Sequence, residues 1–209
     1  MAKLTDKKII LTGGAGDIAR VAAAQFLREG AQLMLVDHDE NALHNAVASL
    51  SSEQAAYCVA DVTSAADTQR YIETAMNRFG RLDVLMANAG IEGNVAPVSE
   101  YDEDMYDKVM AVNVKGVFLA LKYAFPLMAA GGGGSVIIMS SIAGLRGHSG
   151  LSAYNTSKHA VIGLMRSAAI EGAEHNIRVN TINPSPVESR MIQSLEAQSM
   201  PDDPALAHE

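Results

Sequence analysis

The sequence predicts an α/β fold in a single domain: a doubly wound parallel sheet with helices on both faces. Short apolar runs alternate with longer amphipathic stretches, which is the pattern of β-α-β units. Runs such as residues 33–36 and 136–139 are apolar throughout, as strands covered on both faces should be. The glycine run at residues 131–134 has the same patterns on both sides, so it connects a helix to a strand within one domain.

The individual elements follow from this alternation. With 209 residues, 48% of them hydrophobic and 19% charged, the chain is long enough to bury one sizeable core. The expected strands are residues 8–12, 32–37, 55–60, 82–87, 135–140 and 177–183. The expected helices are residues 18–29, 40–50, 65–79, 103–128 and 152–172, the last with Ser152 as its N-cap.

The C-terminal part departs from the alternation. Residues 183–187 contain two prolines and open a loop, and residues 187–200 are expected to form a short helix. Residues 201–204, Pro-Asp-Asp-Pro, have the pattern of another helix start, which the sequence abandons at Glu209. The sixth strand is therefore expected to be an uncovered edge of the sheet.

Charge and cysteine content exclude several classes of protein. The 16 Lys and Arg residues against 24 Asp and Glu residues give a net charge of −8, which disfavours a nucleic-acid partner. The single cysteine, Cys58, excludes an internal disulfide framework and a cysteine-rich metal site, and no metal is expected. The first residues carry charges and no apolar block typical of a signal peptide, so a reducing, cytoplasmic location is expected.

Residues 109–130 are mostly apolar and need a separate test as a membrane segment. A membrane-spanning helix needs about 20 predominantly apolar residues with few or no charges. Here Asn113, Lys115, Lys122 and Pro126 interrupt the run. We therefore expect no membrane partner, and a helix that is either buried or packed against another subunit.

The first strand is followed by a candidate nucleotide-binding turn. Residues 12–19 read Thr-Gly-Gly-Ala-Gly-Asp-Ile-Ala and lead directly into a helix. Glycines at such a turn let backbone N–H groups approach a pyrophosphate, and the helix N-terminus adds partial positive charge. The alternative is an ordinary β-α turn that is rich in glycine.

Acidic and amide residues follow the next strands. Asp37 ends the second strand, where a carboxylate accepts hydrogen bonds from the adenosine ribose and repels a 2′-phosphate, which favours NAD over NADP. The alternative is that Asp37 caps the next helix together with its acidic neighbours. Asp61 after the third strand and Asn88-Ala89-Gly90 after the fourth are placed to meet the cofactor, although each alone is weak evidence.

A third group of residues is placed for chemistry. Tyr154 and Lys158 are four residues apart and lie on one helix face. Ser141 follows the fifth strand, where the ligand crevice of such a sheet lies, and Asn113 lies in the long preceding helix. Taken singly, each has an ordinary alternative: a strand-end serine, an exposed tyrosine or a polar defect in an apolar helix.

In this order, the motifs resemble those of the short-chain dehydrogenase/reductase family, whose fold is Rossmann-like, from Thr12 to Val187. The resemblance implies a catalytic tetrad of Asn113, Ser141, Tyr154 and Lys158. It implies NAD as the cofactor, bound by Gly13, Gly16, Asp17, Ile18, Asp37, Asp61, Val62, Asn88, Ala89, Gly90, Tyr154, Lys158, Pro184 and Val187.

Each tetrad residue has an expected role. Tyr154 exchanges a proton with the substrate oxygen, and Lys158, aided by the charge of the nicotinamide, brings the pKa of Tyr154 down from its usual value near 10. Ser141 hydrogen-bonds the same oxygen. Lys158 also holds the nicotinamide ribose, and Asn113 binds a water that links Lys158 to solvent. The hydride belongs to the nicotinamide.

The chain departs from the family pattern at several positions. Asp17 and Ala19 replace glycines of the first turn, and Ser185 replaces a glycine after Pro184. Asp17 is expected to point outward, because a carboxylate aimed at the pyrophosphate would repel it. The last strand of the family is absent, and residues 185–209 are expected to form an incomplete substrate lid. Ile91 is a candidate for the substrate side, and His148 is either there or in a solvated loop.

These observations favour an oxidoreductase that transfers a hydride between NAD(H) and a secondary alcohol or ketone. The alternative is a dinucleotide-binding protein without catalytic activity, in which Asp17 or the missing strand has ended turnover. The family resemblance further implies a homodimer or homotetramer. The net charge of −8 disfavours a third class, a nucleic-acid-binding protein of the same fold.

Overall fold

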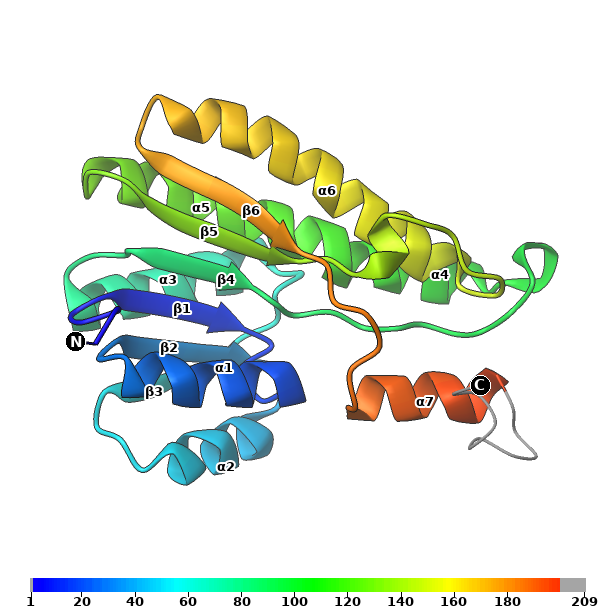
Figure 1. The fold of residues 1–209 in the computed structure, drawn as a ribbon, viewed down its shortest axis with the longest axis horizontal. Helices are drawn as coiled ribbons and strands as arrows, with labels where there is room; N and C mark the ends of the chain where they lie inside the picture. The colour runs from blue at the N-terminus through cyan, green and yellow to red at the C-terminus, as the bar shows by residue number, and fades with distance from the viewer. Residues whose placement is uncertain (1, 200–209) are drawn as a thin grey trace.

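The computed structural model describes residues 2–199, which form a six-stranded parallel sheet in the order β3-β2-β1-β4-β5-β6 (Figure 1). The order reverses between β1 and β4, so this is the doubly wound α/β sheet that the sequence predicts. The strands are β1 (Lys8–Thr12), β2 (Gln32–Asp37), β3 (Ala55–Val59), β4 (Val84–Ala87), β5 (Gly134–Met139) and β6 (Ile177–Ile182).

Helices connect the strands and cover both faces of the sheet. They are α1 (Asp17–Arg28), α2 (Glu40–Leu50), α3 (Ala65–Phe79), α4 (Glu103–Met110), α5 (Gly116–Ala130), α6 (Ser152–Ala173) and α7 (Arg190–Ser199), with short 3₁₀ turns at Val98–Glu100 and Ile142–Gly144. The predicted strands and helices are all present within the described residues, and most bounds agree to within two residues. The expected helix start at residues 201–204 lies outside the described residues.

The core has two layers because successive strand residues point to opposite faces of the sheet. Ile9 and Leu11 of β1 belong to the cluster that α1 and α2 cover, with Ala23 and Leu43 as helix partners. Ile10 belongs to the opposite cluster, which α3, α5 and α6 cover. Both layers are almost free of exposed surface, so the sheet is a rigid support for the loops at its carboxyl ends.

The ends of the helices explain most of the predicted bounds. Asp39 caps α2 by accepting a hydrogen bond from the backbone N–H of Ala42, and Ser64 and Asp102 cap α3 and α4 in the same way. The prediction that Ser152 is the N-cap of α6 is wrong. The cap is Leu151, whose carbonyl accepts the N–H of Asn155 at 2.8 Å, and Ser152 is the first helical residue.

The predicted helix at residues 103–128 is one continuous helical stretch with a change of pitch. A π-helical segment, Ala111–Lys115, separates α4 from α5, and the N–H of Gly116 donates to the carbonyl of Ala111, five residues earlier. The stretch Glu103–Ala130 has the length and hydropathy of a membrane-spanning helix. In the fold it supplies Ala120, Ala124 and Met128 to the core, so it acts here as a core helix.

The sheet ends at β6, which is hydrogen-bonded only to β5 among the described strands. Among residues 2–199 the outer edge of β6 is therefore unpaired, as expected. Arg178, Asn180 and Ile182 are exposed on the outer face of β6.

An open groove of about 750 Å³ lies between α1, the end of α2 and the start of α7, and its lining includes Asp17 and Arg190. Figure 1 shows α7 beyond the arrowheads of the strands.

Candidate active site

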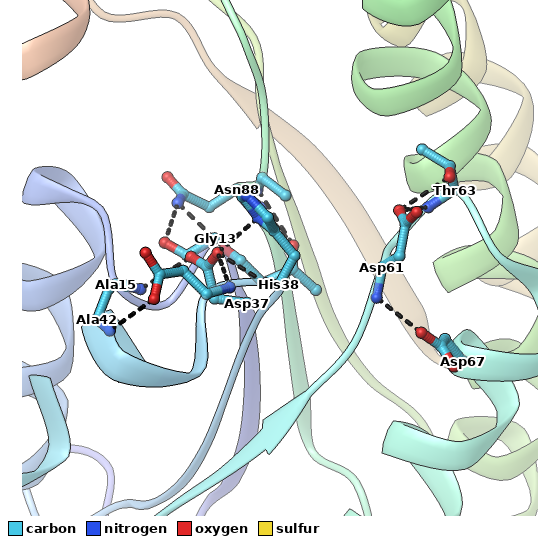
Figure 2. Close-up of polar contacts among 12 residues, drawn as sticks. Gly13, Ala15, Asp37, His38, Ala42, Asp61, Thr63, Asp67 and Asn88 are labelled. Carbon is cyan, nitrogen blue, oxygen red and sulfur yellow. Dashed lines mark hydrogen bonds and ion pairs between the residues drawn. The ribbon is translucent and has the colours of Figure 1, made fainter. Parts of the chain in front are cut away.

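The turn after β1 is hydrogen-bonded to the turn after β4, at the point where the strand order reverses. The hydroxyl of Thr12 accepts the backbone N–H groups of Asn88 and Ala89 at 3.1 and 3.2 Å. The amide nitrogen of Asn88 donates to the carbonyls of Thr12 and Gly13 at 3.1 and 3.3 Å (Figure 2). The predicted Asn-Ala-Gly turn therefore fixes the shape of the glycine turn.

The glycine turn is packed too tightly for side chains. Gly13 has φ +64°, and a Cβ there would lie 2.8 Å from the Cα of Ala89. A Cβ on Gly14 would lie 2.8 Å from the Cβ of Leu35. Gly16 is the N-cap of α1 and supplies no side-chain hydrogen bond, so the first N–H groups of α1, beginning near Ile18, lack a capping side chain.

Asp37 holds the glycine turn from the end of β2. Its carboxylate accepts the N–H of Ala15 at 3.1 Å and the N–H of His38 at 2.8 Å, and it pairs with the His38 ring at 3.0 Å (Figure 2). The cap of α2 is Asp39, as described above. The part of the alternative interpretation that makes Asp37 itself a helix cap is therefore wrong, and the part that gives the cap to an acidic neighbour is confirmed.

Asp61 belongs to a separate polar cluster after β3. Its carboxylate accepts the N–H and the hydroxyl of Thr63, both at 2.8 Å, and its own N–H donates to Asp67 at 2.8 Å (Figure 2). The next residue, Val62, packs against Gly116, where a Cβ would lie 3.0 Å from Val62 Cγ2. The third strand thus presents Asp61 at the same carboxyl edge of the sheet as Asp37.

Tyr154 and Lys158 lie together on the face of α6 that points into the protein. The ammonium nitrogen of Lys158 is 5.4 Å from the centre of the Tyr154 ring and donates to the carbonyl of Met139 at 2.9 Å. A Cβ on Gly90 would lie 3.4 Å from this ammonium nitrogen and 3.2 Å from Asn113 Oδ1. The fold therefore brings Lys158, Asn113 and the Asn-Ala-Gly turn to one place.

Asn113 lies in the π-helical segment and is buried. Its Oδ1 accepts the N–H of Ile91 at 2.8 Å, and its Nδ2 donates to the carbonyl of Ile91 at 2.9 Å and to the hydroxyl of Ser157 at 3.0 Å. Both amide hydrogens are used within the protein, while Oδ1 keeps a second lone pair, so the water expected to link Lys158 to solvent stays a prediction. The side chain also fixes the loop after β4.

The titration of the two α6 residues follows from burial. Burial raises the pKa of Tyr154; hydrogen bonding with Ser141 lowers it, and the charge of Glu92 raises it. Burial lowers the pKa of Lys158 to about 8 from 10.5. The expectation that Lys158 lowers the pKa of Tyr154 invoked the charge of the nicotinamide as well, and the net direction in the protein alone is upward.

The loop after β6 is tied to the turn that carries Ser141. The carbonyl of Pro184 accepts the N–H of Ile142 at 2.9 Å, and Ser141 itself accepts the N–H of Ala143 at 3.1 Å. Val187 is exposed, and its carbonyl accepts the hydroxyl of Ser189 at 3.0 Å.

Helix α7 then crosses above Tyr154, with the sulfur of Met191 3.8 Å from the Tyr154 hydroxyl. Of the two residues suggested for the substrate side, Ile91 is half-buried. His148 is exposed and hydrogen-bonds with Asn155, as the solvated-loop interpretation expects.

Two further residues of the site, Glu92 and Arg190, were not predicted from the sequence. Glu92 is buried, and Arg190 at the start of α7 makes a two-pronged ion pair with it. Asp17 is exposed, and its carboxylate accepts the backbone N–H of Arg190 at 2.9 Å. It thus reaches toward α7, whereas the sequence analysis expected it only to point outward. Arg190 is the only Lys or Arg after Arg178, and this isolation was the one feature of the sequence that could have marked it as a site residue.

The residues present fit a dinucleotide. Gly13 and Gly14 leave no room for side chains, a carboxylate stands at the end of β2, and Lys158 is buried beside Gly90. Asp17 is the one residue in the turn whose charge opposes a pyrophosphate, and its hydrogen bond to Arg190 turns it toward α7. The site therefore fits a dinucleotide when the Asp17 carboxylate is in its observed position.

Comparison with known proteins gives consistent matches. The family model for short-chain dehydrogenases matches residues 7–200. Levodione reductase of Leifsonia aquatica is 34% identical over 99% of this chain and 79% of its own length. The A-factor type gamma-butyrolactone 1′-reductase of Streptomyces virginiae is 38% identical over 98% of this chain and 80% of its own.

Solved structures give the same result. The crystal structure of levodione reductase superposes with a TM-score of 0.96, covering 99% of this chain and 82% of that protein at 34% identity. The structure of an NAD⁺-bound xylitol dehydrogenase superposes with a TM-score of 0.90, covering 96% and 79% at 34% identity.

Proposed function

Because the chain belongs to the short-chain dehydrogenase/reductase family, we propose that it transfers a hydride between NAD(H) and a secondary alcohol or its ketone. Members of the family are oxidoreductases that act on such substrates. The observation that carries the proposal is the placement of Tyr154 and Lys158 on one buried helix face beside Gly90, with Ser141 near the Tyr154 hydroxyl. The names of two relatives, levodione reductase and a butyrolactone 1′-reductase, describe carbonyl reductions.

In this proposal the protein's groups handle binding and the proton, and the bound nicotinamide supplies or accepts the hydride. The turn at Gly13 and Gly16 and the first turn of α1 hold the pyrophosphate, and Asp37 holds the adenosine ribose. Asp61, Val62 and the Asn88–Gly90 turn complete the cofactor side. Pro184 and Val187 close it from the loop after β6, and residues 185–199 serve as the described part of the substrate lid.

Tyr154 exchanges the proton with the substrate oxygen. Burial raises the pKa of its hydroxyl, so the phenol is protonated at neutral pH and ready to donate to a carbonyl. Lys158, with a pKa of about 8, is mostly charged at neutral pH and stabilises the phenolate that remains. Ser141 orients the same oxygen, and Asn113 holds the loop that faces it.

Asp37 is expected to set the preference for NADH over NADPH. The change Asp37→Asn removes the negative charge that repels a 2′-phosphate and weakens the bonds to the ribose, so we expect the preference to fall by about tenfold or more. Kd values for both cofactors, from fluorescence titration, measure it. Asp39→Asn is the matched control, because asparagine still caps α2 while the same charge is lost nearby. Equal effects in both variants would contradict the role of Asp37.

The proposed function is tested by binding first and turnover second. Mixing the protein with NADH should enhance the cofactor's fluorescence, and a panel of cyclic and linear ketones should then consume NADH. Binding without any turnover across the panel would favour the alternative, a dinucleotide-binding protein without activity. Asp17, a carboxylate at the cofactor turn, is the observation that favours this alternative. Absence of binding at millimolar cofactor would contradict both.

We also propose that the protein assembles as a homodimer or homotetramer in the cytoplasm. Phe118 of α5 and Ile170 of α6 are 48% and 76% exposed, and both lie on helices that leave one face without a covering layer. Large apolar side chains on an outer helix face are typical of a subunit interface.

A further inference from the structure

Helix α7 is held against the loop after β4 by a charge pair. Arg190 donates from Nη1 to one oxygen of Glu92 at 2.9 Å and from Nη2 to the other at 3.3 Å. The Glu92 side chain is 9% exposed and that of Arg190 is 69% exposed, so an arginine on the lid reaches down to a buried carboxylate. Two-pronged pairs of this kind fix orientation as well as distance.

The loop that carries Glu92 is also held by a contact that does not involve α7. The residue before it, Ile91, has its N–H and its carbonyl both bonded to the amide of Asn113, at 2.8 and 2.9 Å. Arg190 is bonded on its other side as well, because its backbone N–H donates to Asp17 at 2.9 Å. The start of α7 is therefore joined to α1 and to the loop after β4 at a single residue.

The far end of α7 has a contact with the same loop that involves no charge. The side chain of Gln198 accepts the N–H of Val95 at 3.0 Å and donates to the carbonyl of Gly93 at 3.5 Å. Between the two ends, the sulfur of Met191 lies 3.8 Å from the Tyr154 hydroxyl. The Arg190 contact and the Gln198 contact both hold α7 over Tyr154, but only the Arg190 contact is between charged groups.

The charges around Tyr154 come from several elements. Lys158 lies beneath the ring on α6, Glu92 lies on the loop after β4, and Arg190 on α7 pairs with Glu92. Ser141 and Met191, which face the hydroxyl from the turn after β5 and from α7, are neutral. Glu92 disfavours the phenolate, and Arg190 offsets the charge of Glu92.

We propose that Glu92 and Arg190 are a positioning pair for the proposed reaction, in which Arg190 seats α7 over Tyr154 and offsets the buried carboxylate, setting the pH range of proton transfer. The inference rests on the proposed function for its meaning in catalysis. The pair acts through Tyr154 and is not itself assigned contact with the substrate.

The test is a set of three variants with opposite expected signs. Arg190→Gln leaves Glu92 uncompensated and also loosens α7, as Gln198→Ala does without a change of charge; relative to Gln198→Ala, the ionisation of Tyr154 should therefore lie higher by about 0.5 to 1 pH unit. Glu92→Gln removes the carboxylate that disfavours the phenolate and leaves Arg190 beside Asp17, so ionisation should move to lower pH by a similar amount. The double variant E92Q/R190Q should return close to the parent value, because both charges are gone.

Two control variants separate the effect of the Arg190 charge from the effect of the position of α7. Gln198→Ala loosens α7 without changing any charge, so KM should rise severalfold, and any shift of the Tyr154 ionisation to lower pH measures the loss of burial alone. Arg190→Lys keeps the charge but loses the two-pronged geometry, so KM should rise and the pH dependence should stay near that of the parent. If Arg190→Gln fails to fold, the shift of Glu92→Gln to lower pH, measured against Arg190→Lys, decides the role of the charges.

Ionisation of Tyr154 can be read without turnover. Phenolate absorbance is titrated in the full chain, and the same titration with Tyr154→Phe in each background isolates Tyr154 from the other five tyrosines. Opposite shifts that cancel in the double variant support the pair. No shift, or shifts of one sign, would overturn it. A parent protein that binds no NADH and reduces no ketone contradicts the proposed function instead, and the phenolate titration decides the pair separately.

Discussion

Tyr154→Phe should lower turnover by about 10³-fold or more while leaving NADH affinity within about twofold. The change removes only the hydroxyl that exchanges the proton. The ring keeps its place against Lys158, whose ammonium nitrogen is 5.4 Å from the ring centre. The position is buried, so phenylalanine fills the same volume and opens no cavity. Steady-state rates with an active ketone and a fluorescence titration with NADH measure the two quantities.

A second buried tyrosine provides the control for this experiment. Tyr71 of α3 is fully buried, and within residues 2–199 its hydroxyl has no hydrogen-bond partner. Tyr71→Phe should therefore leave turnover unchanged and the free energy of unfolding equal or slightly higher. Equal loss of cofactor affinity and turnover in Tyr154→Phe would mean that Tyr154 holds the cofactor and does not carry the proton.

The parts of the site that sequence can predict are those that follow strand ends. The positions of Asp37, Asn88 and Ser141 were predictable because parallel strands bring their carboxyl ends to one edge of the sheet. The pairing of Tyr154 with Lys158 was predictable because four residues make about one helical turn. In each case the position depends on the helical repeat or on the end of a strand, and both can be recognised from the local sequence pattern.

The contacts that sequence could not predict join distant segments. Asp17 meets Arg190 across 173 positions, and Glu92 meets Arg190 across 98. These contacts depend on the path of the loop after β6. This loop has no regular pattern of apolar residues and pairs with no strand, so its path cannot be predicted from the sequence. The π-helical segment at Asn113 was missed for a related reason, since a single change of pitch leaves the apolar pattern of the helix almost unaltered.

Lys158→Met should abolish most of the activity and yet make the protein more stable at neutral pH. Burial lowers the pKa of Lys158 to about 8, from 10.5 in an exposed lysine, so the fold carries a charge that it disfavours. A difference of this size corresponds to about 3 kcal/mol at most. Methionine matches the lysine side chain as far as its last carbon, but the carbonyl of Met139 loses its donor, at a cost of about 1 kcal/mol. We expect a net gain of about 1–2 kcal/mol in the free energy of unfolding.

The gain in the free energy of unfolding of Lys158→Met should decrease as pH rises. Below about 8, Lys158 is charged in both the folded and the unfolded chain, and the folded chain carries the full cost of burying the charge. Between about 8 and 10.5, the folded chain has released the proton and the unfolded chain still binds it, so parent stability rises with pH relative to the variant. Urea unfolding of both proteins across this range should show the advantage of Lys158→Met shrinking as pH increases.

Lys122 offers the matched comparison, because it is an exposed lysine on α5. Lys122→Met should change the free energy of unfolding by less than about 0.5 kcal/mol, with no trend between neutral and alkaline pH. A Lys158→Met variant that is less stable than the parent at neutral pH would show that the bond to Met139 outweighs the burial of charge. Lys158 would then stabilise the fold as well as serve the site. The expected opposite result means that the fold gives up stability to keep a cation beside Tyr154, which is typical of a residue retained for chemistry.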